Sequence, residues 1–434
     1  MSAWLDKVLT RQRMLMYPAA LLVATLAAYL LVAARSDNLI EPSGKIIGHD
    51  FLAFYMAGEM AAEGQVEPLY QPAAQTAWQQ AFMAPINPKW QGTCLYLNPP
   101  HYAWLMSWIS WLGYGGALAA WWVFSLACFA ATAAIWRRWL DREDWVLAVI
   151  LAVSMPAWFQ SLAGGQNTFV TLMVLSGFCA CLLNRWDLRA GLVLSLLAFK
   201  FQFLLIPAAV LLVKGRWRAI GGLALGGGLT LILTVVMLGP ESISQYVRFG
   251  SSLGELMRTE GFDVYKQHSW HGFFALAGSG WLPASAVRVL TGAAALGCLW
   301  LLWRIWKGPR SREPGIPELQ LAGLMLVTLM ASPHLFHYDM LLSALPAVLW
   351  LRAFRERPEL SRQMAGVRIV LVAGFAWLAV GGLISGAAHV QASPVLMAVW
   401  TYLTAAAVGR AGLPTAAHDS TLTERDPFRG VARS

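Results

Sequence analysis

Apolar runs close to membrane-spanning length recur along almost the whole sequence, beginning at Met14 and ending at Arg410. An α-helix rises about 1.5 Å per residue, so about 20 apolar residues cross a hydrocarbon core of about 30 Å. Such runs lie at 14–34, 117–136, 145–162, 168–183, 219–239, 282–304, 317–332, 338–351, 367–386 and 394–410. The sequence therefore predicts an all-α polytopic membrane protein with about 10 to 12 transmembrane helices.

The composition agrees with a membrane protein and argues against a large soluble one. Hydrophobic residues make up 58% of the 434 residues and charged residues 13%, whereas about a quarter of a soluble domain is charged. The net charge of +9 is assigned to cytoplasmic loops, where Lys and Arg collect. Membrane lipids are thus the expected surroundings, and a nucleic-acid partner is excluded.

The segments at 99–112 and 190–213 do not behave like ordinary spans. The first is short for a full crossing. The second is long enough, but basic residues flank both of its ends, namely Arg185, Arg189, Lys214, Arg216 and Arg218. If 190–213 is a hairpin that re-enters from the cytoplasm, most of the 32 basic residues lie on the cytoplasmic side. We therefore predict a hairpin rather than a single span.

The tip of this hairpin reads "AFKFQF" and carries Lys200 and Gln202. A lysine within a membrane costs roughly 3 kcal/mol on insertion scales, so it is expected to have a partner. Two partners stay open at this point: a bound anion, or a carboxylate elsewhere in the helical bundle.

The same topology assigns most histidines to the outer side of the membrane and the C-terminal tail to the cytoplasm. Residues 1–411 are predicted to form one membrane domain, and the polar stretch 412–434 a disordered cytoplasmic tail. All histidines except His418 fall in or beside outer loops: His49, His101, His268, His271, His334, His337 and His389. Polar chemistry is therefore expected on the outer side.

The first outer loop, residues 35–99, is long and varied in composition. "DFLAFYMAGEMAAEG" predicts an amphipathic helix on the membrane surface, and "EPLYQPAAQTAWQQAFMA" a turn followed by a second short helix. Asp50 precedes the first helix, where a carboxylate can cap exposed backbone N–H groups. Capping alone is one interpretation of Asp50. Cys94 is the only cysteine outside the apolar runs, so no internal disulfide is expected.

Three further outer segments are polar: "SLAGGQNTF" with Gln166 and Asn167, the loop 240–280 with "YKQHSWHGFF", and "SPHLFHYDM". In the last segment, His334 and His337 are three residues apart and can share a helix face, as a metal pair would. No HExxH motif or cysteine cluster supports a metal site. No metal site or cofactor is assigned, and a divalent cation stays an open alternative.

The ordered motifs resemble glycosyltransferase family 87, the polyprenol-phosphate-mannose-dependent mannosyltransferases of the GT-C superfamily. They are "HDFLAFYMAGEMAAEGQVEPLY", "YLNPPHYAW", "GGQNTF", "LLAFKFQF" and "SPHLFHYD", in order from about 46 to 345. The resemblance implies a GT-C-type bundle in the cell's inner membrane. It also implies inverting transfer of a sugar, mannose by analogy, from a polyprenyl-phosphate carrier to a glycolipid or glycan acceptor on the outer side. The catalytic base is then Asp50.

The expected chemistry fits these residues. A carboxylate can remove the proton of a sugar hydroxyl while the bond from C1 to phosphate breaks, and the departing phosphate needs charge stabilisation. Donor-phosphate or sugar contacts are expected from Lys200, Gln202, Gln166, Asn167, His268, His337, Tyr338 and Asp339. One departure is noted: the family often has Lys-Pro-Gln where this chain has Lys200-Phe201-Gln202.

Two other functions compete with a transferase. A secondary transporter also places Lys and His within the membrane, but transporters usually have two related halves, and no such duplication is apparent. A lipid-linked glycan ligase or polymerase shares the location and the lipid partner. It is expected to carry its main outer loop late in the chain, where the loop 240–280 is only about forty residues long.

Overall fold

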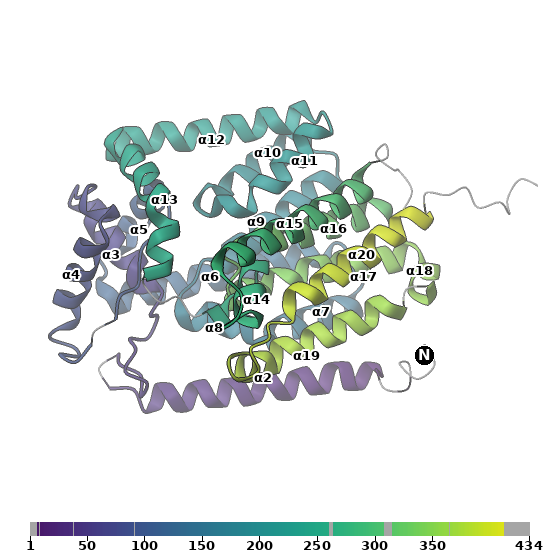
Figure 1. The fold of residues 1–434 in the computed structure, drawn as a ribbon, viewed down its shortest axis with the longest axis horizontal. Coiled ribbons are helices and arrows are strands. Elements are labelled where there is room, and N and C mark those ends of the chain that lie inside the picture. The colour runs from purple at the N-terminus through teal and green to yellow at the C-terminus, as the bar shows by residue number, and fades with distance from the viewer. Residues whose placement is uncertain are drawn as a thin grey trace, which may run out of the picture.

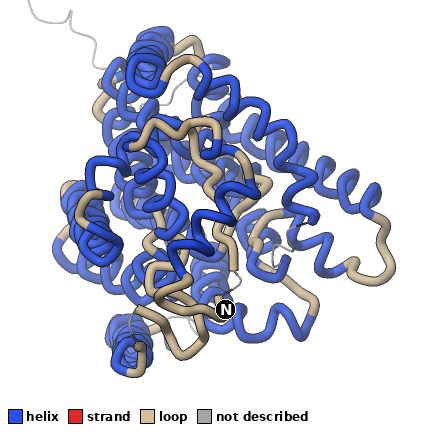
Figure 2. The backbone as a smooth tube through the Cα atoms, turned by 90° about the vertical axis from the view of Figure 1, so that its left-hand side faces the viewer, coloured by secondary structure: helices blue, strands red, loops and turns tan. Residues whose placement is uncertain are grey.

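The computed structural model describes residues 7, 9–37, 39–90, 92–259, 264–307, 315–363 and 365–411. Within these ranges the chain is helical and contains no strand (Figure 2). The α-helices are α2 Arg11–Ala34, α3 Phe51–Ala62, α4 Pro72–Met83, α5 Pro100–Ser110, α6 Gly113–Arg137, α7 Arg142–Ser154, α8 Pro156–Gly164, α9 Thr168–Leu183, α10 Asp187–Ser195, α11 Leu205–Val213, α12 Trp217–Leu238, α13 Glu241–Thr259, α14 Trp270–Ala277, α15 Ala284–Trp306, α16 Ile316–Ala331, α17 Ala344–Glu356, α18 Pro358–Gln363, α19 Ala365–Ala388 and α20 Ser393–Ala411. The 3₁₀ helices are η1 Pro68–Tyr70, η2 Leu196–Phe203, η3 Val264–Lys266 and η4 His337–Ser343.

The prediction of a polytopic membrane protein is confirmed. Among the described residues, five helices are long and apolar enough to cross a membrane, or up to seven if each of two bent helix pairs is one span. The five are α2, α6, α12, α15 and the 365–382 part of α19. The larger number expected from the sequence also counted shorter apolar helices, such as α9 and α16 with 16 residues each.

Two predicted spans are interrupted in the structure. The run 145–162 divides into α7 and α8, which meet at an angle of 58° where Pro156 begins the second helix. A proline disfavours a helical residue before it, which explains the break at Met155. The run 338–351 begins as the 3₁₀ helix η4 and becomes α-helical only at Ala344. The predicted polar tail 412–434 lies outside the described residues.

The segment 190–213 turns back on itself, as the hairpin prediction requires. The helices on either side of Leu204 differ in direction by 119°, which excludes a straight span. Lys200 lies at the break inside η2, with a non-helical φ of −132° and ψ of 61°.

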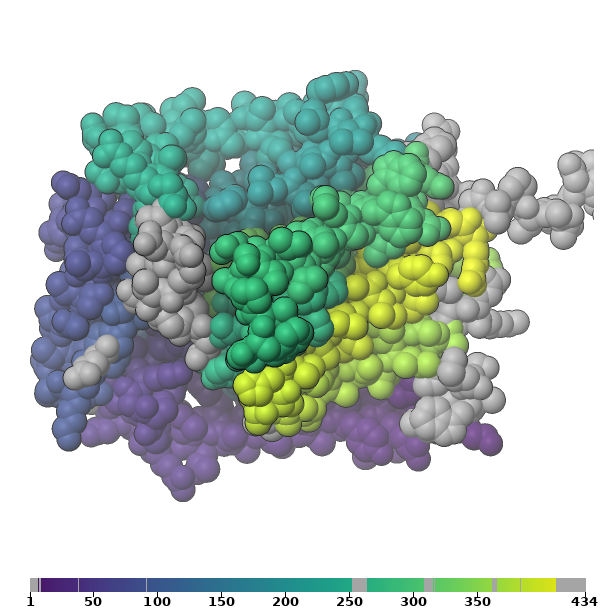
Figure 3. Space-filling view, in the orientation of Figure 1, coloured from purple at the N-terminus to yellow at the C-terminus, as the bar shows by residue number. Residues whose placement is uncertain are grey.

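The first-loop helices gather at one end of the molecule, where α3, α4 and α5 lie beside one another (Figure 1). The space-filling view shows the same layer at the left-hand end, above the long N-terminal helix α2 along the lower edge (Figure 3). The chain between α12 and α14 returns to this layer, because Tyr246 and Phe249 of α13 pack on Tyr70 with ring centroids 5.4 and 5.6 Å apart.

The interpretation of 51–62 as an amphipathic surface helix is corrected by the structure. Nine of the twelve residues of α3 are buried, so α3 is a core helix rather than a helix on a membrane surface. It packs against α5 so closely that a Cβ added at Gly58 would lie 2.8 Å from the backbone of Met106. Its polar residue Glu59 is only partly buried.

The hairpin is held in place by a very close helix crossing. A Cβ added at Gly191 of α10 would lie 1.8 Å from the carbonyl oxygen of Ala219. On the facing helix α12, a Cβ at Gly222 would lie 2.1 Å from the carbonyl oxygen of Leu188. These are backbone atoms that cannot rotate away, so only glycine allows this crossing and the resulting position of the hairpin tip.

A matched pair of glycine substitutions tests this crossing. Gly222→Ala is expected to lower the free energy of unfolding by about 1–3 kcal/mol, the usual cost of overpacking. Gly221→Ala has no heavy atom within 4 Å of its new Cβ and is expected to be neutral or stabilising, since alanine favours a helix. Thermal unfolding of both variants in the same detergent measures the difference. Equal midpoints would contradict the proposed crossing.

Candidate functional site

Asp50 stands at the start of α3, but it does not cap that helix. Its backbone is helical, with φ of −78° and ψ of −29°, and its side chain makes no capping hydrogen bond. The interpretation of Asp50 as a cap alone is therefore wrong. Its side chain is 22% exposed, and Oδ1 lies 3.6 Å from Nε2 of His49 and 3.9 Å from the Cys94 sulfur. A carboxylate in a mainly buried position that serves no helix end is available for chemistry.

The turn before Asp50 explains its placement. Gly48 has φ of +73°, which favours glycine, and a Cβ there would lie 2.8 Å from the Leu118 side chain. The Tyr114 hydroxyl of α6 lies 2.6 Å from the carbonyl oxygen of Ile47 and 2.9 Å from that of Gly48. The turn is thus fixed to α6, and His49 and Asp50 follow it in one orientation.

The two glycines of "GGQNTF" pack against this turn. A Cβ added at Gly164 would lie 2.9 Å from Oδ2 of Asp50, and one at Gly165 would lie 2.6 Å from Cβ of Phe51. Gly165 also ends α8 in the left-handed conformation, with φ of +72°. These glycines let the backbone approach Asp50 and Phe51 closely.

The polar segments "YKQHSWHGFF" and "SPHLFHYDM" contact each other. Gln267 and Phe336 form an isolated antiparallel bridge, and the backbone N–H of His268 donates to the carbonyl oxygen of Leu335 at 2.6 Å. Nδ1 of His268 lies 2.7 Å from the Ser393 hydroxyl. His337 lies close enough to Asp50 for the carboxylate to affect its titration. Three segments far apart in the chain therefore converge around Asp50.

The expectation that His334 and His337 share a helix face is wrong. His334 lies in the non-helical stretch before η4, and η4 begins at His337. In the part of the chain that the structure describes, no group of three His, Cys, Asp or Glu side chains is arranged to hold a metal ion.

Burial favours the neutral form of His337 and His268 by lowering the pKa of each. Burial lowers the pKa of His337 to about 4, and the positive charges of Lys266 and Lys45 add to the lowering, while Asp50 opposes it. Burial also lowers the pKa of His268 to about 3, with a smaller contribution from His337. Neutral imidazoles provide both a donor and an acceptor nitrogen.

The shifted pKa of His337 predicts a pH dependence of stability. Between about pH 6.5 and pH 4 the unfolded chain binds a proton at His337 that the folded chain does not, so stability falls as the pH falls through this window. Each unit between the two pKa values is worth about 1.4 kcal/mol. His337→Asn is expected to flatten this part of the dependence, measured as thermal midpoints from pH 7.5 to 4.5. An unchanged slope in the variant would contradict the assignment.

Lys200 is paired with Asp339, in agreement with the second of the two partners left open by the sequence. Nζ of Lys200 lies 2.7 Å from Oδ1 of Asp339, and the Thr168 hydroxyl donates to the same oxygen at 3.2 Å. The side chain of Lys200 is 9% exposed and that of Asp339 is 2% exposed. Nζ also lies 5.4 Å from the ring centre of Tyr338. This buried pair joins the hairpin tip to η4, next to the residues that face Asp50.

The neutral amides of the site differ in their surroundings. Asn167 is 1% exposed, and neither atom of its amide has a hydrogen-bond partner. It lies near the Tyr102 hydroxyl, which also has no partner that meets hydrogen-bond geometry. Gln166 is 8% exposed, and Gln202, beyond Lys200, is half-buried.

Buried side-chain atoms without hydrogen-bond partners are concentrated in these segments. Buried polar groups are nearly always paired, so each such atom needs an explanation, and a role in binding a polar ligand is one. Among the described residues, the unpaired atoms of the converging segments belong to His49, Tyr102, Asn167, Gln267, Ser332, His334 and His337. Together with Asp50 they give the site a set of donors and acceptors suited to a polar ligand.

Several residues of the site were not found from the sequence. Thr168 could have been found, because it directly follows Asn167 in the polar motif "GGQNTF". Lys45, Lys266 and Tyr102 had none, because an isolated lysine or tyrosine near an apolar run is ordinary. Cys94 has the sequence pattern of an ordinary loop cysteine, because its contact with Asp50 spans 44 positions of the chain.

Comparisons with known proteins identify one family. Residues 96–333, more than half of the chain, match the sequence model described as Glycosyltransferase family 87. The match covers the GGQNTF turn, the hairpin with Lys200 and the loop with His268, and it begins after Asp50. No curated protein and no solved structure matched the chain.

Proposed function

This chain belongs to glycosyltransferase family 87, and on that premise we propose that it takes a sugar from a polyprenyl-phosphate carrier and transfers it with inversion. The observation that carries the proposal is Asp50, a carboxylate without a capping role that lies 3.6 Å from His49 and close to His337 in an otherwise apolar helical protein. Mannose is the proposed sugar, and a glycolipid or glycan on the extracytoplasmic side of the cell membrane is the proposed acceptor.

Asp50 acts as general base in this proposal. An acceptor hydroxyl is a weak nucleophile, and its proton passes to the Asp50 carboxylate as the hydroxyl oxygen attacks C1 of the sugar. The bond between C1 and the carrier phosphate breaks, and the phosphate leaves with the electron pair. Attack from the side opposite the phosphate inverts the configuration at C1.

The donor phosphate is proposed to lie beside His337. Lys45 and Lys266 both act on the titration of His337, which supports positive charge at this place. Neutral His337 and His268 add N–H donors for phosphate oxygens. Lys200 and Asp339 together carry no net charge, so we assign Lys200 to orienting the phosphate and holding Tyr338 rather than to supplying net charge.

The sugar is proposed to lie over the neutral amides. Asn167 carries an unpaired donor and an unpaired acceptor in a buried position, and both suit sugar hydroxyl groups. Gln166, in the turn between α8 and α9, and Gln202 of the hairpin are proposed to bind sugar hydroxyl groups as well.

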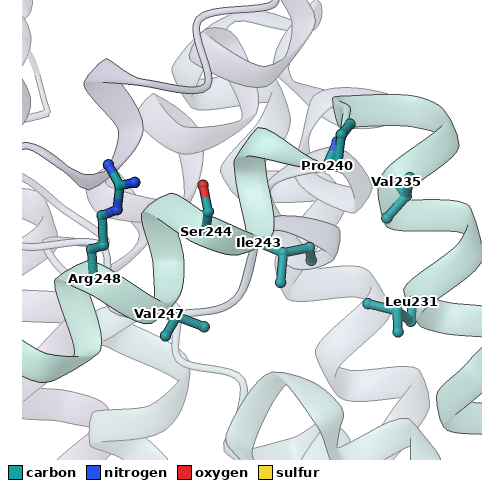
Figure 4. A pocket seen from close by; sticks show the side chains of 7 residues that line it. All are labelled: Leu231, Val235, Pro240, Ile243, Ser244, Val247 and Arg248. Carbon is teal, nitrogen blue, oxygen red and sulfur yellow. The ribbon is translucent and has the colours of Figure 1, made fainter.

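The lipid chain of the carrier has a candidate path between α12 and α13. A groove of about 550 Å³ opens there, and Ile243 of α13 faces Leu231 of α12 across it (Figure 4). The lining is Leu231, Val235, Pro240, Ile243, Ser244, Val247 and Arg248. Only 11% of the apolar window of α12 is buried, so a hydrocarbon chain would reach this groove from the bilayer.

A transfer assay with a panel of donors tests the proposal. Purified protein in liposomes is given polyprenyl-phosphate mannose, glucose and arabinose, with the matching nucleotide sugars as controls, and glycolipid acceptors. The expected result is transfer from one of the lipid-linked donors and none from a nucleotide sugar. Transfer from a nucleotide sugar would contradict the proposed donor. Uptake of a solute into the liposomes with no transfer from any donor would favour a transporter instead.

A further inference from the structure

The thiol of Cys94 lies beside the Asp50 carboxylate. Its sulfur is 3.9 Å from Oδ1 and 4.0 Å from the backbone oxygen of Asp50, both within the distances of weak S–H hydrogen bonds. Burial raises the pKa of the thiol, and the nearby Asp50 carboxylate raises it further. Cys94 therefore keeps its proton at neutral pH and can donate it to the carboxylate.

Two glutamines of α4 hold the segment that carries Cys94. Gln79 accepts from the backbone N–H of Cys94 at 2.9 Å and donates to its carbonyl oxygen at 2.6 Å. One turn earlier, Gln75 makes a similar pair of bonds with the backbone of Tyr96, at 2.7 and 3.4 Å. Both glutamines are fully buried. Side-chain hydrogen bonds from α4 to the backbone therefore fix the position of the segment that carries Cys94.

The other oxygen of the carboxylate, Oδ2, lies beside a glycine rather than beside a hydrogen-bond donor. Oδ2 of Asp50 faces Gly164, where an added Cβ would come within 2.9 Å. Oδ1 faces Cys94 and His49. The two oxygens are thus unequal: Oδ1 has neighbours that can donate, and Oδ2 lies next to a glycine that leaves space.

We propose that Cys94 is a positioning residue whose thiol holds Oδ1 of Asp50 and leaves Oδ2 to accept the proton of the acceptor hydroxyl. This inference rests on the proposed function for its catalytic part. The proton moves from the hydroxyl to Oδ2, while the thiol proton stays on sulfur throughout. Gln79 serves the same purpose by fixing the backbone of Cys94.

Substitutions at Cys94 test the proposal through the pH profile. Cys94→Ala is expected to lower kcat about three- to tenfold, the effect of one hydrogen bond, with KM nearly unchanged. A donor that favours the charged carboxylate is lost, so the acid limb of the kcat profile moves to higher pH. Cys94→Ser keeps a donor and is expected to restore most of both effects. The titratable groups that face Asp50 and stay in place in these variants are His49, Tyr114, His337, Tyr338 and Asp339.

Gln79 and Gln75 provide a matched pair. Gln79→Leu is expected to move the acid limb in the same direction as Cys94→Ala. Gln75→Leu removes the same kind of backbone clamp two residues further on, and it is expected to leave the acid limb where it is. Equal shifts in both variants, or a profile of Cys94→Ala that matches wild type, would overturn the proposal.

A measurement without transferase activity separates this proposal from the proposed function. In a variant that keeps Cys94 and lacks the other four cysteines, the rate of reaction with a methanethiosulfonate reagent is measured against pH. Asp50→Asn removes the neighbouring negative charge, so the thiol is expected to ionise at lower pH and react faster at a given pH. An unchanged profile would show that Cys94 and Asp50 do not interact, whatever reaction the protein catalyses.

Discussion

Asp50→Asn is expected to lower kcat for sugar transfer about 10³-fold, within the range that a general base contributes. The amide keeps the shape of the carboxylate but cannot take the proton of the acceptor hydroxyl. Because Asp50 makes no capping hydrogen bond, the substitution is expected to leave the thermal midpoint and the binding of the lipid donor close to wild type. Transfer is measured with a labelled donor, and folding by thermal unfolding in the same detergent.

Glu59→Gln is a matched control for this substitution. Glu59 lies on the same helix α3 and is only partly buried, so the same exchange of acid for amide is expected to change kcat less than twofold, the scale of a surface change of about 0.5 kcal/mol. A variant Asp50→Asn that transfers sugar as fast as Glu59→Gln would show that Asp50 is not the base.

Lys200→Met alone is expected to lower the free energy of unfolding by about 3–5 kcal/mol, because Asp339 would keep a buried charge without its partner. Asp339→Leu alone has the same expected effect. The double variant Lys200→Met, Asp339→Leu removes both charges and is expected to recover most of the lost stability, since apolar pairs replace buried ion pairs at little cost. Thermal and denaturant unfolding of the four proteins measure the coupling.

The pair of Arg352 and Glu318 is the control for that cycle. Its atoms are 2.9 Å apart, but the arginine side chain is 23% exposed, against 9% for Lys200. Its coupling is therefore expected to be smaller. If the double variant at 200 and 339 is no more stable than the single variants, the two charges do not act as a pair.

The fold was predictable from the sequence where the signal was local. Long apolar runs and basic flanks predicted the membrane helices and the hairpin at 190–213, because length, hydropathy and charge act within one segment. The burial of α3 was not predictable, since a short apolar helix looks the same on a membrane surface and in a protein core. Its surroundings are set by α5, through the close approach at Gly58.

Residues of the candidate site could be selected from the sequence, but their contacts could not. Asp50, Lys200 and the late histidines were found because polar residues are rare among apolar runs. The ion pair of Lys200 joins residues 139 positions apart, and the contact of Asp50 with Cys94 joins residues 44 apart. A single sequence carries no record of such pairs. The close approach of Gly164 to His49 and Asp50 could not be predicted either, because it exists only once α3 and α8 have packed together.

The most direct test of the account follows donor and product together. Purified wild type and Asp50→Asn are incubated with polyprenyl-phosphate mannose and a glycolipid acceptor, and both polyprenyl phosphate and the glycosylated acceptor are quantified. We predict that wild type releases one polyprenyl phosphate for each sugar transferred, with the new bond of opposite anomeric configuration, and that Asp50→Asn forms almost no product. Equal product from both proteins, or retained configuration at C1, would contradict Asp50 as the base of an inverting transfer.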